Sequence, residues 1–256
     1  MISLANLVYI DETANGKTMD DSFGIIANAE IAFSGFLHSS NVNLIEQNES
    51  GEYAVSVMNE LNKEKTSRIV DSIKHLFQSD CAWYGEGGYA ADFCKGKALL
   101  SLTSTYNLPN YLNYDIQFGV LPYPLYDENQ KDAGYRSLQW GGYLCVPSYV
   151  RDINMVGDAL EVISFYSEDV NNAFYEKLLG KQVAESPIDK RMLEIVWDGV
   201  CSDFGQTFYY SFYGSEILYL VSRLAVVDTT KELGSFTASA EKVINKSLKK
   251  LFSKTS

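Results

Sequence analysis

The chain of 256 residues can form one large domain or two lobes, and 46% hydrophobic with 21% charged residues allows a core and excludes wholesale disorder. Lys and Arg total 21 against 33 Asp and Glu, for a net charge of -12. A nucleic-acid-binding surface needs clustered cations, and the one such cluster, residues 242–254, falls on a predicted amphipathic helix. We therefore expect no nucleic-acid partner.

The amino-acid sequence shows neither a transmembrane segment nor a secretory signal peptide. No apolar run approaches the length of about 18 residues that a transmembrane helix needs, so none is predicted. Residues 1–9 lack the basic start and apolar stretch of a secretory signal peptide. Either the protein is cytoplasmic or its beginning lies outside this sequence.

The first elements are predicted from apolar spacing and turn residues. Residues 2–10 are apolar enough for a helix or strand and lead into a turn at residues 11–17, which are rich in Asp, Asn and Gly. Residues 23–27 predict a short buried strand, and residues 25–37 a strand that passes into a helix. Residues 59–77 place Leu, Ile and Phe at helical spacing among charged residues, which predicts a helix.

The middle of the chain predicts short elements broken by glycine and proline. A helix is expected at residues 90–96, and after Gly96 a strand at residues 97–104. Strands are also expected at residues 116–121 and 143–146, each of which is followed by a proline that cannot donate to a ladder. A polar loop at residues 127–136 separates them.

The last hundred residues are predicted to be mainly helical. Residues 154–166 carry a marked amphipathic pattern with Met, Val, Ala, Leu and Ile on one face. Further helices are predicted at residues 169–179, 187–199, 214–225 and 235–252. The chain is therefore a mixed α/β protein with many helices and few short strands.

Three sequence patterns resemble known sites but lack their context. Residues 85–90 fit G-x-G-x-x-A, but a dinucleotide site needs a strand before the glycines and a long helix after them. The triplet at residues 203–205 spells D-F-G without the other kinase motifs. The acidic stretch at residues 11–21 lacks the ligand alternation of a calcium loop, so a plain turn is favoured.

Catalytic and metal chemistry has little support. His38 and His75 are the only histidines, and a satisfied or solvated histidine is a better interpretation of either than a general base. The four cysteines form no C-x-x-C pair and have no histidine at ligand spacing, so no zinc site is predicted; a disulfide stays open, but four largely buried thiols are preferred. They are Cys81, Cys94, Cys145 and Cys201. We predict no catalytic residue, no metal and no cofactor.

Several segments together resemble the family 1 extracellular solute-binding proteins. The densest match is F-G-V-L-P-Y-P-L-Y-D-E-N-Q at residues 118–130, followed by G-G-Y-L-C-V-P at residues 141–147. Before them, residues 23–25 read F-G-I and residues 93–100 read F-C-K-G-K-A-L-L. Weaker matches follow, with A-L-E at residues 159–161, F-Y-E at 174–176, D-K-R-M-L-E-I at 189–195 and D-F-G at 203–205. The resemblance covers about residues 10–252.

That resemblance implies a fold and a place for the protein. The fold is an α/β, periplasmic-binding-protein-like type II clamshell, here incomplete because the signal peptide, the lipid-attachment cysteine and the first part of the N-terminal lobe are not in the sequence. Residues 1–97 are expected to form the first segment of the C-terminal lobe, residues 98–165 a partial N-terminal lobe with exposed apolar surface, and residues 166–256 the return to the C-terminal lobe. Family members are extracellular, membrane-associated lipoproteins.

The resemblance also implies a function, which is capture of a small solute for the permease subunits of an ABC importer. The solute it implies is a sugar. Sugars stack on aromatic rings while a few polar groups read their hydroxyls. Candidate ligand-binding residues are therefore aromatic residues in loops and the glycines beside them: Trp83, Tyr84, Tyr106, Trp140, Gly141 and Gly142. A glycosidase-like enzyme with two carboxylates and a ligand-free protein-interaction module remain the alternatives.

Overall fold

The protein is a mixed α/β structure, as the sequence predicts. The computed structural model describes residues 2–5, 7–27, 29–51, 53–57, 59–84, 89–111, 113–139, 144–179, 187–207, 242, 245–247, 249–250 and 253. The helix predicted at residues 214–225, most of the one predicted at 235–252, and Tyr143 lie outside the described residues. No helix of the described part is long and apolar enough to cross a membrane.

A parallel sheet of three strands forms the centre of the molecule, in the order β4-β1-β5. Its members are β1 (Phe23–Ala27), β4 (Ala82–Tyr84) and β5 (Ala98–Leu102). The central strand β1 is buried along its whole length, which explains its continuous apolar sequence. The strands predicted at residues 23–27 and 97–104 are confirmed, and β4 was not predicted.

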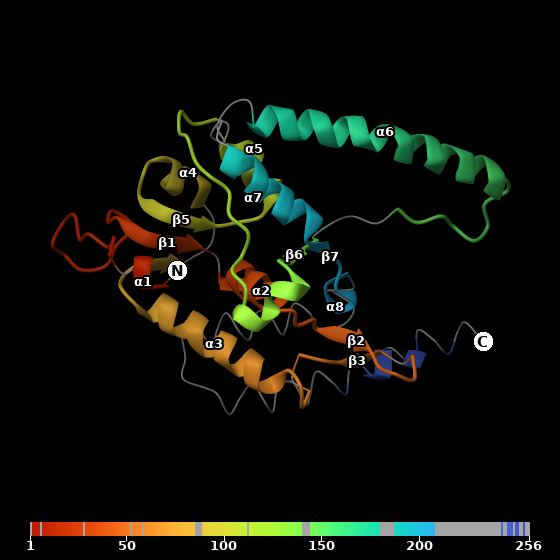
Figure 1. Ribbon diagram of the computed structural model, residues 1–256, viewed down its shortest axis with the longest axis horizontal. Coiled ribbons are helices and arrows are strands. Elements are labelled where there is room, and N and C mark those ends of the chain that lie inside the picture. The colour runs from red at the N-terminus through yellow and green to blue at the C-terminus, as the bar shows by residue number, and fades with distance from the viewer. Residues whose placement is uncertain are drawn as a thin grey trace.

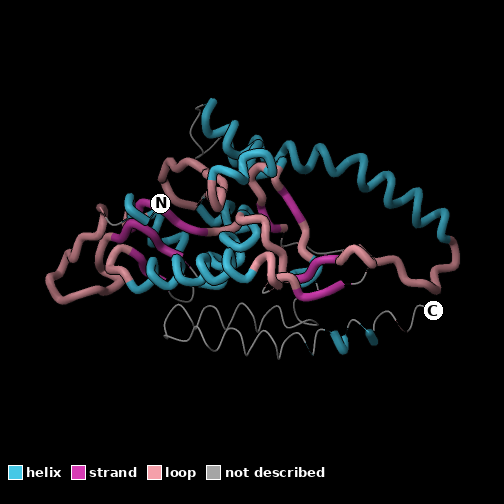
Figure 2. Tube along the Cα trace, turned by 60° about the horizontal axis from the view of Figure 1, so that its bottom comes forward, coloured by secondary structure: helices cyan, strands magenta, loops and turns pink. Residues whose placement is uncertain are grey.

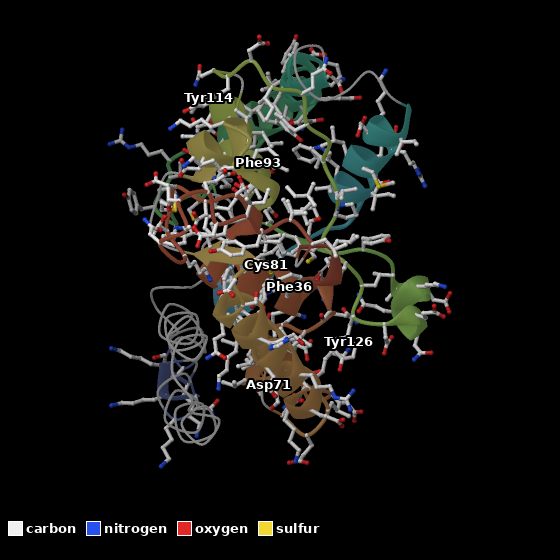
Figure 3. All side chains as sticks on the ribbon, turned by 90° about the vertical axis from the view of Figure 1, so that its left-hand side faces the viewer. Phe36, Asp71, Cys81, Phe93, Tyr114 and Tyr126 are labelled. Carbon is white, nitrogen blue, oxygen red and sulfur yellow. The ribbon has the colours of Figure 1, made fainter. Side chains whose placement is uncertain are left out.

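Helices cover both faces of this sheet (Figure 1). The helices α2 (Ala29–Ser39) and α3 (Lys63–Gln78) lie on one face, and α4 (Tyr89–Cys94) lies on the other. Figure 3 shows the same separation, with the ring of Phe93 from α4 above Cys81 and Phe36. The short helix α1 (Ile2–Ala5) packs against β1.

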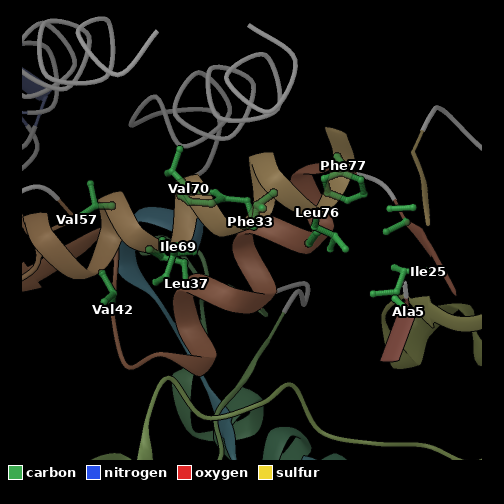
Figure 4. Packing of buried hydrophobic residues seen from close by; sticks show 14 of the residues in the cluster. Ala5, Ile25, Phe33, Leu37, Val42, Val57, Ile69, Val70, Leu76 and Phe77 are labelled. Atoms are coloured by element: carbon green, nitrogen blue, oxygen red, sulfur yellow. The ribbon is translucent and has the colours of Figure 1, made fainter. Parts of the chain in front are cut away.

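The larger core lies between α2, α3 and the sheet. Phe33 and Leu37 of α2 meet Ile69 and Leu76 of α3 in a cluster that has no access to solvent (Figure 4). The apolar residues of α3 recur every three or four positions and therefore share one face. The helix predicted at residues 59–77 is confirmed except at its start, because Leu61 precedes α3 and is exposed.

A second, smaller core lies on the α4 side of the sheet. It joins Phe118 and Leu193 to α5 (Leu108–Tyr111), with Phe93 beside them. Leu193 comes from α7 (Pro187–Asp198), which confirms the helix predicted at residues 187–199. The strand predicted at residues 116–121 is wrong. Phe118 packs its ring 5.3 Å from that of Tyr111 and makes a single β-bridge, but no strand forms over this segment.

A small antiparallel hairpin was missed by the sequence pattern. The strands β2 (Ile45–Gln47) and β3 (Tyr53–Val55) are only three residues long, too short for a visible alternation. Gly51 lies in their turn with a φ of +82°, a conformation that favours glycine. The stacked rings of Tyr53 and Phe204, with centroids 4.2 Å apart, join the hairpin to α8 (Phe204–Thr207).

The segment between the cores is irregular. In place of the predicted polar loop at residues 127–136, a 3-10 helix η2 (Glu128–Ala133) begins where the Asp127 carboxylate accepts from the Asn129 amide. The strand β6 (Ser137–Leu138) then pairs in parallel with β7 (Val200–Cys201). The strand predicted at residues 143–146 is wrong over residues 144–146, which have no regular structure and leave Leu144 exposed.

The helices predicted at residues 154–166 and 169–179 form one helix, α6 (Ile153–Leu179). Most of α6 extends away from the rest of the described chain (Figure 2). The exposed apolar surface expected within residues 98–165 is found here, for example at Ile163 and Phe165. The expected boundary at residue 97 falls between β4 and β5, which share one sheet, and the division into lobes stays a prediction.

The cysteines differ from the expectation of four largely buried thiols. All four are free, and Cys81 is buried, whereas Cys145 is exposed because it lies in the irregular segment before α6. Cys94 and Cys201 are partly buried, and burial raises the pKa of both thiols. The expectation therefore holds only for Cys81.

Tyr123 lies against α2 and leaves a buried polar group without a partner. Its ring meets Phe36 edge-on at 5.2 Å, and a side chain in place of Gly35 would collide with it. The Tyr123 hydroxyl is shielded from solvent and has no hydrogen-bond partner among the described residues. Burial accordingly raises the pKa of this phenol.

Replacing Tyr123 with Phe is expected to stabilise the protein by about 1 kcal/mol, because it removes a hydroxyl that loses hydration without gaining a partner. Urea unfolding followed by circular dichroism measures the change. Tyr106→Phe is the matched control, since that side chain is exposed and should change stability by less than about 0.5 kcal/mol. A loss of stability in Tyr123→Phe would show that the hydroxyl has a partner.

Candidate functional site

The carboxyl ends of the three parallel strands meet at one edge of the central sheet. Tyr84, the last residue of β4, and Leu102, the last of β5, both pair with Ala27 at the end of β1. The chain then leaves β1 toward α2 on one face and β4 toward α4 on the other. In open α/β sheets, ligands bind outside the carboxyl ends of strands whose connections leave on opposite faces.

Tyr106 is the most exposed candidate at this edge. It lies in the 3-10 helix η1 (Thr105–Asn107), four residues after the end of β5, and 86% of its surface is accessible. An exposed tyrosine offers an apolar ring face and a hydroxyl to a ligand. The neighbouring polar groups are neutral, and the Asn107 amide donates to the Thr103 hydroxyl at 3.2 Å.

Trp83 occupies a more enclosed position. It faces Ile26 across the β1–β4 ladder, and its ring lies 5.4 Å from the ring of Phe23. Phe23 in turn lies 5.8 Å from the ring of Tyr9. Trp83 is therefore part of an aromatic row at the sheet, and only part of its surface is accessible.

The remaining predicted site residues cannot be compared with these. The backbone of Tyr84 places it at the same sheet edge as Tyr106, on the opposite side of β1. Trp140, Gly141 and Gly142 lie outside the described residues, as does the glycine-rich stretch at residues 85–88. The backbone thus places Tyr84 and Tyr106 at the carboxyl edge of the sheet, whereas the Trp83 ring packs against Phe23 at the start of β1.

Charge is scarce along the segments that form this edge. Residues 98–114, which comprise β5, η1 and α5, contain no Asp, Glu, Lys or Arg, and neither do residues 22–29 around the end of β1. Hydroxyl, amide and phenol groups are the polar groups of these segments. Such a surface suits a neutral polar ligand better than a phosphate or a carboxylate, which would need a cation.

Away from this edge, titratable groups gather in a buried polar cluster around His38 and Asp203. His38 Nε2 lies 2.8 Å from Asp203 Oδ2 and His38 Nδ1 lies 2.7 Å from the Ser34 carbonyl oxygen. Both side chains are essentially inaccessible. Neither ring nitrogen is free to act on a substrate, which confirms the interpretation of His38 as a satisfied histidine; His75, in the last turn of α3, is solvated.

Asp203 connects several segments in this cluster through hydrogen bonds to its carboxylate. Its carboxylate accepts hydrogen bonds from the backbone amides of Gly205 at 2.6 Å and Gln206 at 3.1 Å, which start α8. It also accepts from the amide of Leu44 at 2.5 Å, beside β2. The D-F-G triplet therefore has a structural role in this chain: its aspartate caps the start of α8 and links this helix to α2 and the hairpin by hydrogen bonds.

The acidic turn at residues 11–21 is held by its own carboxylates. Asp11 accepts from the amides of Thr13 and Gly16. The buried Asp21 accepts from the amides of Glu12 and Thr18. The predicted plain turn is confirmed, and no group of three or more potential metal ligands is found within the described part of the chain.

Two comparisons with known proteins found no match. No model of a protein family matches the sequence, and no curated protein matches it significantly.

Proposed function

We propose that the protein binds a small neutral solute, a carbohydrate, and acts as the substrate-capture component of an ABC importer. The observation that carries the proposal is the carboxyl edge of the central parallel sheet, where residues 98–114 carry no charge and Tyr106 is exposed beyond β5. The motifs at residues 118–130 and 141–147 support the same family of solute-binding proteins. The proposal includes the finer fold, a type II clamshell of which this chain holds one lobe and part of the other.

Recognition in this proposal divides between stacking and hydrogen bonding. The ring of Tyr106 stacks on the C–H face of a sugar, and the Thr103 to Asn107 segment supplies hydroxyl and amide groups for the sugar hydroxyls. Trp140 with Gly141 and Gly142 would add a second ring and a close backbone approach. No chemical step is proposed, and the protein partners in this proposal are the permease subunits of the importer in the membrane.

Tyr106→Ala is expected to weaken solute binding by about five-fold, because a lost aromatic contact is worth on the order of 1 kcal/mol. Isothermal titration of the purified chain with neutral mono-, di- and trisaccharides measures the affinity. Glucose 6-phosphate and gluconate serve as charged comparators and should bind more weakly than their neutral counterparts. Thermal melting should remain nearly unchanged, since Tyr106 is exposed.

Tyr149→Ala is the matched control for this experiment. Tyr149 is also 86% exposed but lies in the segment that leads into α6, away from the end of β5. Its loss should leave the affinity unchanged. Equal affinities for wild type and Tyr106→Ala would remove Tyr106 from the site, and turnover of an aryl glycoside that one carboxylate substitution abolishes would favour the glycosidase alternative.

A further inference from the structure

Helix α6 presents an apolar face that nothing in the described chain covers. Its C-terminal part is held in the smaller core by Phe174. Toward its N-terminus the helix runs outward, clear of α5 and α7 (Figures 1 and 2). No described helix or strand packs along it extensively.

Most of the exposed apolar residues of α6 form one continuous stripe, and Ile153 and Phe165 lie outside it. At 100° per residue, positions 155, 159, 162, 163, 166 and 170 fall within about a third of the helix circumference. The large members are between 56% and 68% exposed: Met155, Val162, Ile163, Tyr166 and Val170. We call these residues the α6 stripe. It continues into Phe174, so that one end of it is already an interface.

The charge around the α6 stripe has a single sign. Residues 152–176 contain six carboxylates and no Lys or Arg: Asp152, Asp158, Glu161, Glu168, Asp169 and Glu176. By the same helical geometry, Asp158 and Asp169 lie along one edge of the stripe. An occupant must therefore bury apolar surface while it places positive charge beside these two carboxylates.

A second copy of α6 does not meet this requirement. An antiparallel pair would bring the Asp158 and Asp169 edges of the two stripes together, and neither stripe carries a cation, since Lys177 lies beyond its end. The net charge of -12 adds long-range repulsion between copies.

We propose that the α6 stripe is the docking surface for a helix of a partner polypeptide, with an apolar ridge flanked by Lys or Arg. The stripe from Met155 to Val170 spans about four turns, or roughly 24 Å, and so accommodates a partner helix of similar length. This interface is independent of the solute site, because none of its residues lies at the carboxyl edge of the sheet.

The test uses two synthetic peptides of about 21 residues with the same Leu ridge at heptad positions a and d. One carries Lys at the flanking e and g positions, and the other carries Glu. Fluorescence anisotropy with the purified chain should show at least ten-fold tighter binding of the Lys peptide. Raising the salt concentration from 0.05 M to 0.5 M should weaken that binding.

Two sets of variants identify the surface. The double variant Val162→Ser, Tyr166→Ser should weaken binding of the Lys peptide at least ten-fold, while Ser164→Ala, on the opposite side of α6, should not change it. The charge reversal Asp158→Lys, Asp169→Lys should switch the preference from the Lys to the Glu peptide. Because these side chains are exposed, circular dichroism should confirm an unchanged fold.

Three outcomes overturn the proposal. The first is failure of the Lys peptide to bind the folded wild type, and the second is equal binding of both peptides. The third is a dimer in sedimentation equilibrium that the Val162→Ser, Tyr166→Ser change dissociates, which would make a second copy the occupant of the stripe.

Discussion

Asp203→Ala is expected to lower the free energy of unfolding by about 3–5 kcal/mol, the cost of removing one partner from a buried ion pair. The change leaves His38 buried without its partner at 2.8 Å and orphans the amides of Leu44, Gly205 and Gln206. A buried donor that loses its acceptor has given up its hydrogen bonds to water on folding and gains none in return, which destabilises the folded state. Urea unfolding monitored by circular dichroism measures the loss.

Two further variants separate the parts of this effect. Asp203→Asn keeps an oxygen for the amides that begin α8 but loses the charge toward His38, so its cost should be smaller than that of Asp203→Ala. Asp198→Ala removes an exposed aspartate and should change stability by less than about 0.5 kcal/mol. Equal stability of Asp203→Ala and Asp198→Ala would contradict the role of Asp203 as a hub.

Phe33→Ala should also destabilise the protein by about 3–5 kcal/mol, because it opens a cavity in the larger core. Phe33 has no accessible surface and fills the space between α2, α3 and the sheet (Figure 4). Neighbouring side chains relax only partly into such a space, so the lost transfer free energy and the cavity both count. Thermal and urea unfolding report the change.

Phe165→Ala is the control, because it makes the same substitution at an exposed position. The ring of Phe165 on α6 is 75% exposed, so its removal should cost less than about 0.5 kcal/mol. A similar cost for both substitutions would mean either that Phe165 is covered in solution or that the core around Phe33 collapses without a cavity. A large cost for both substitutions would indicate the first explanation, and a small cost for both would indicate the second.

Errors in the sequence interpretation share one cause. Residues 116–121 have the composition of a strand, but their pairing is limited to one β-bridge at Phe118, whose side chain is used in the smaller core. Conversely, β2 and β3 exist because they pair with each other, although neither is long enough to be recognised alone. Pairing is a property of two distant segments, and periodicity within one segment does not report it.

For the candidate site, too, the sequence indicates the residues, and the pairing of distant segments decides where they lie. Trp83, Tyr84 and Tyr106 could be selected from the sequence as aromatic residues near glycine or polar loops. The placement of Tyr84 and Tyr106 at the same edge of the sheet depends on the β4-β1-β5 order, which puts segments before and after α4 beside the same strand. The enclosure of the Trp83 ring by Phe23 likewise arises from a contact across 60 positions of the chain, beyond any local pattern.

The sequence by itself determined the local features: the buried β1, the amphipathic α3, α6 and α7, and the acidic turn. Their patterns span a few residues, and the period of 2.0 or 3.6 sets which side chains share a face. Only the tertiary structure decided which faces are covered. It buries His38 against Asp203, 165 positions away, and leaves the α6 stripe exposed, because burial depends on which distant segment packs there.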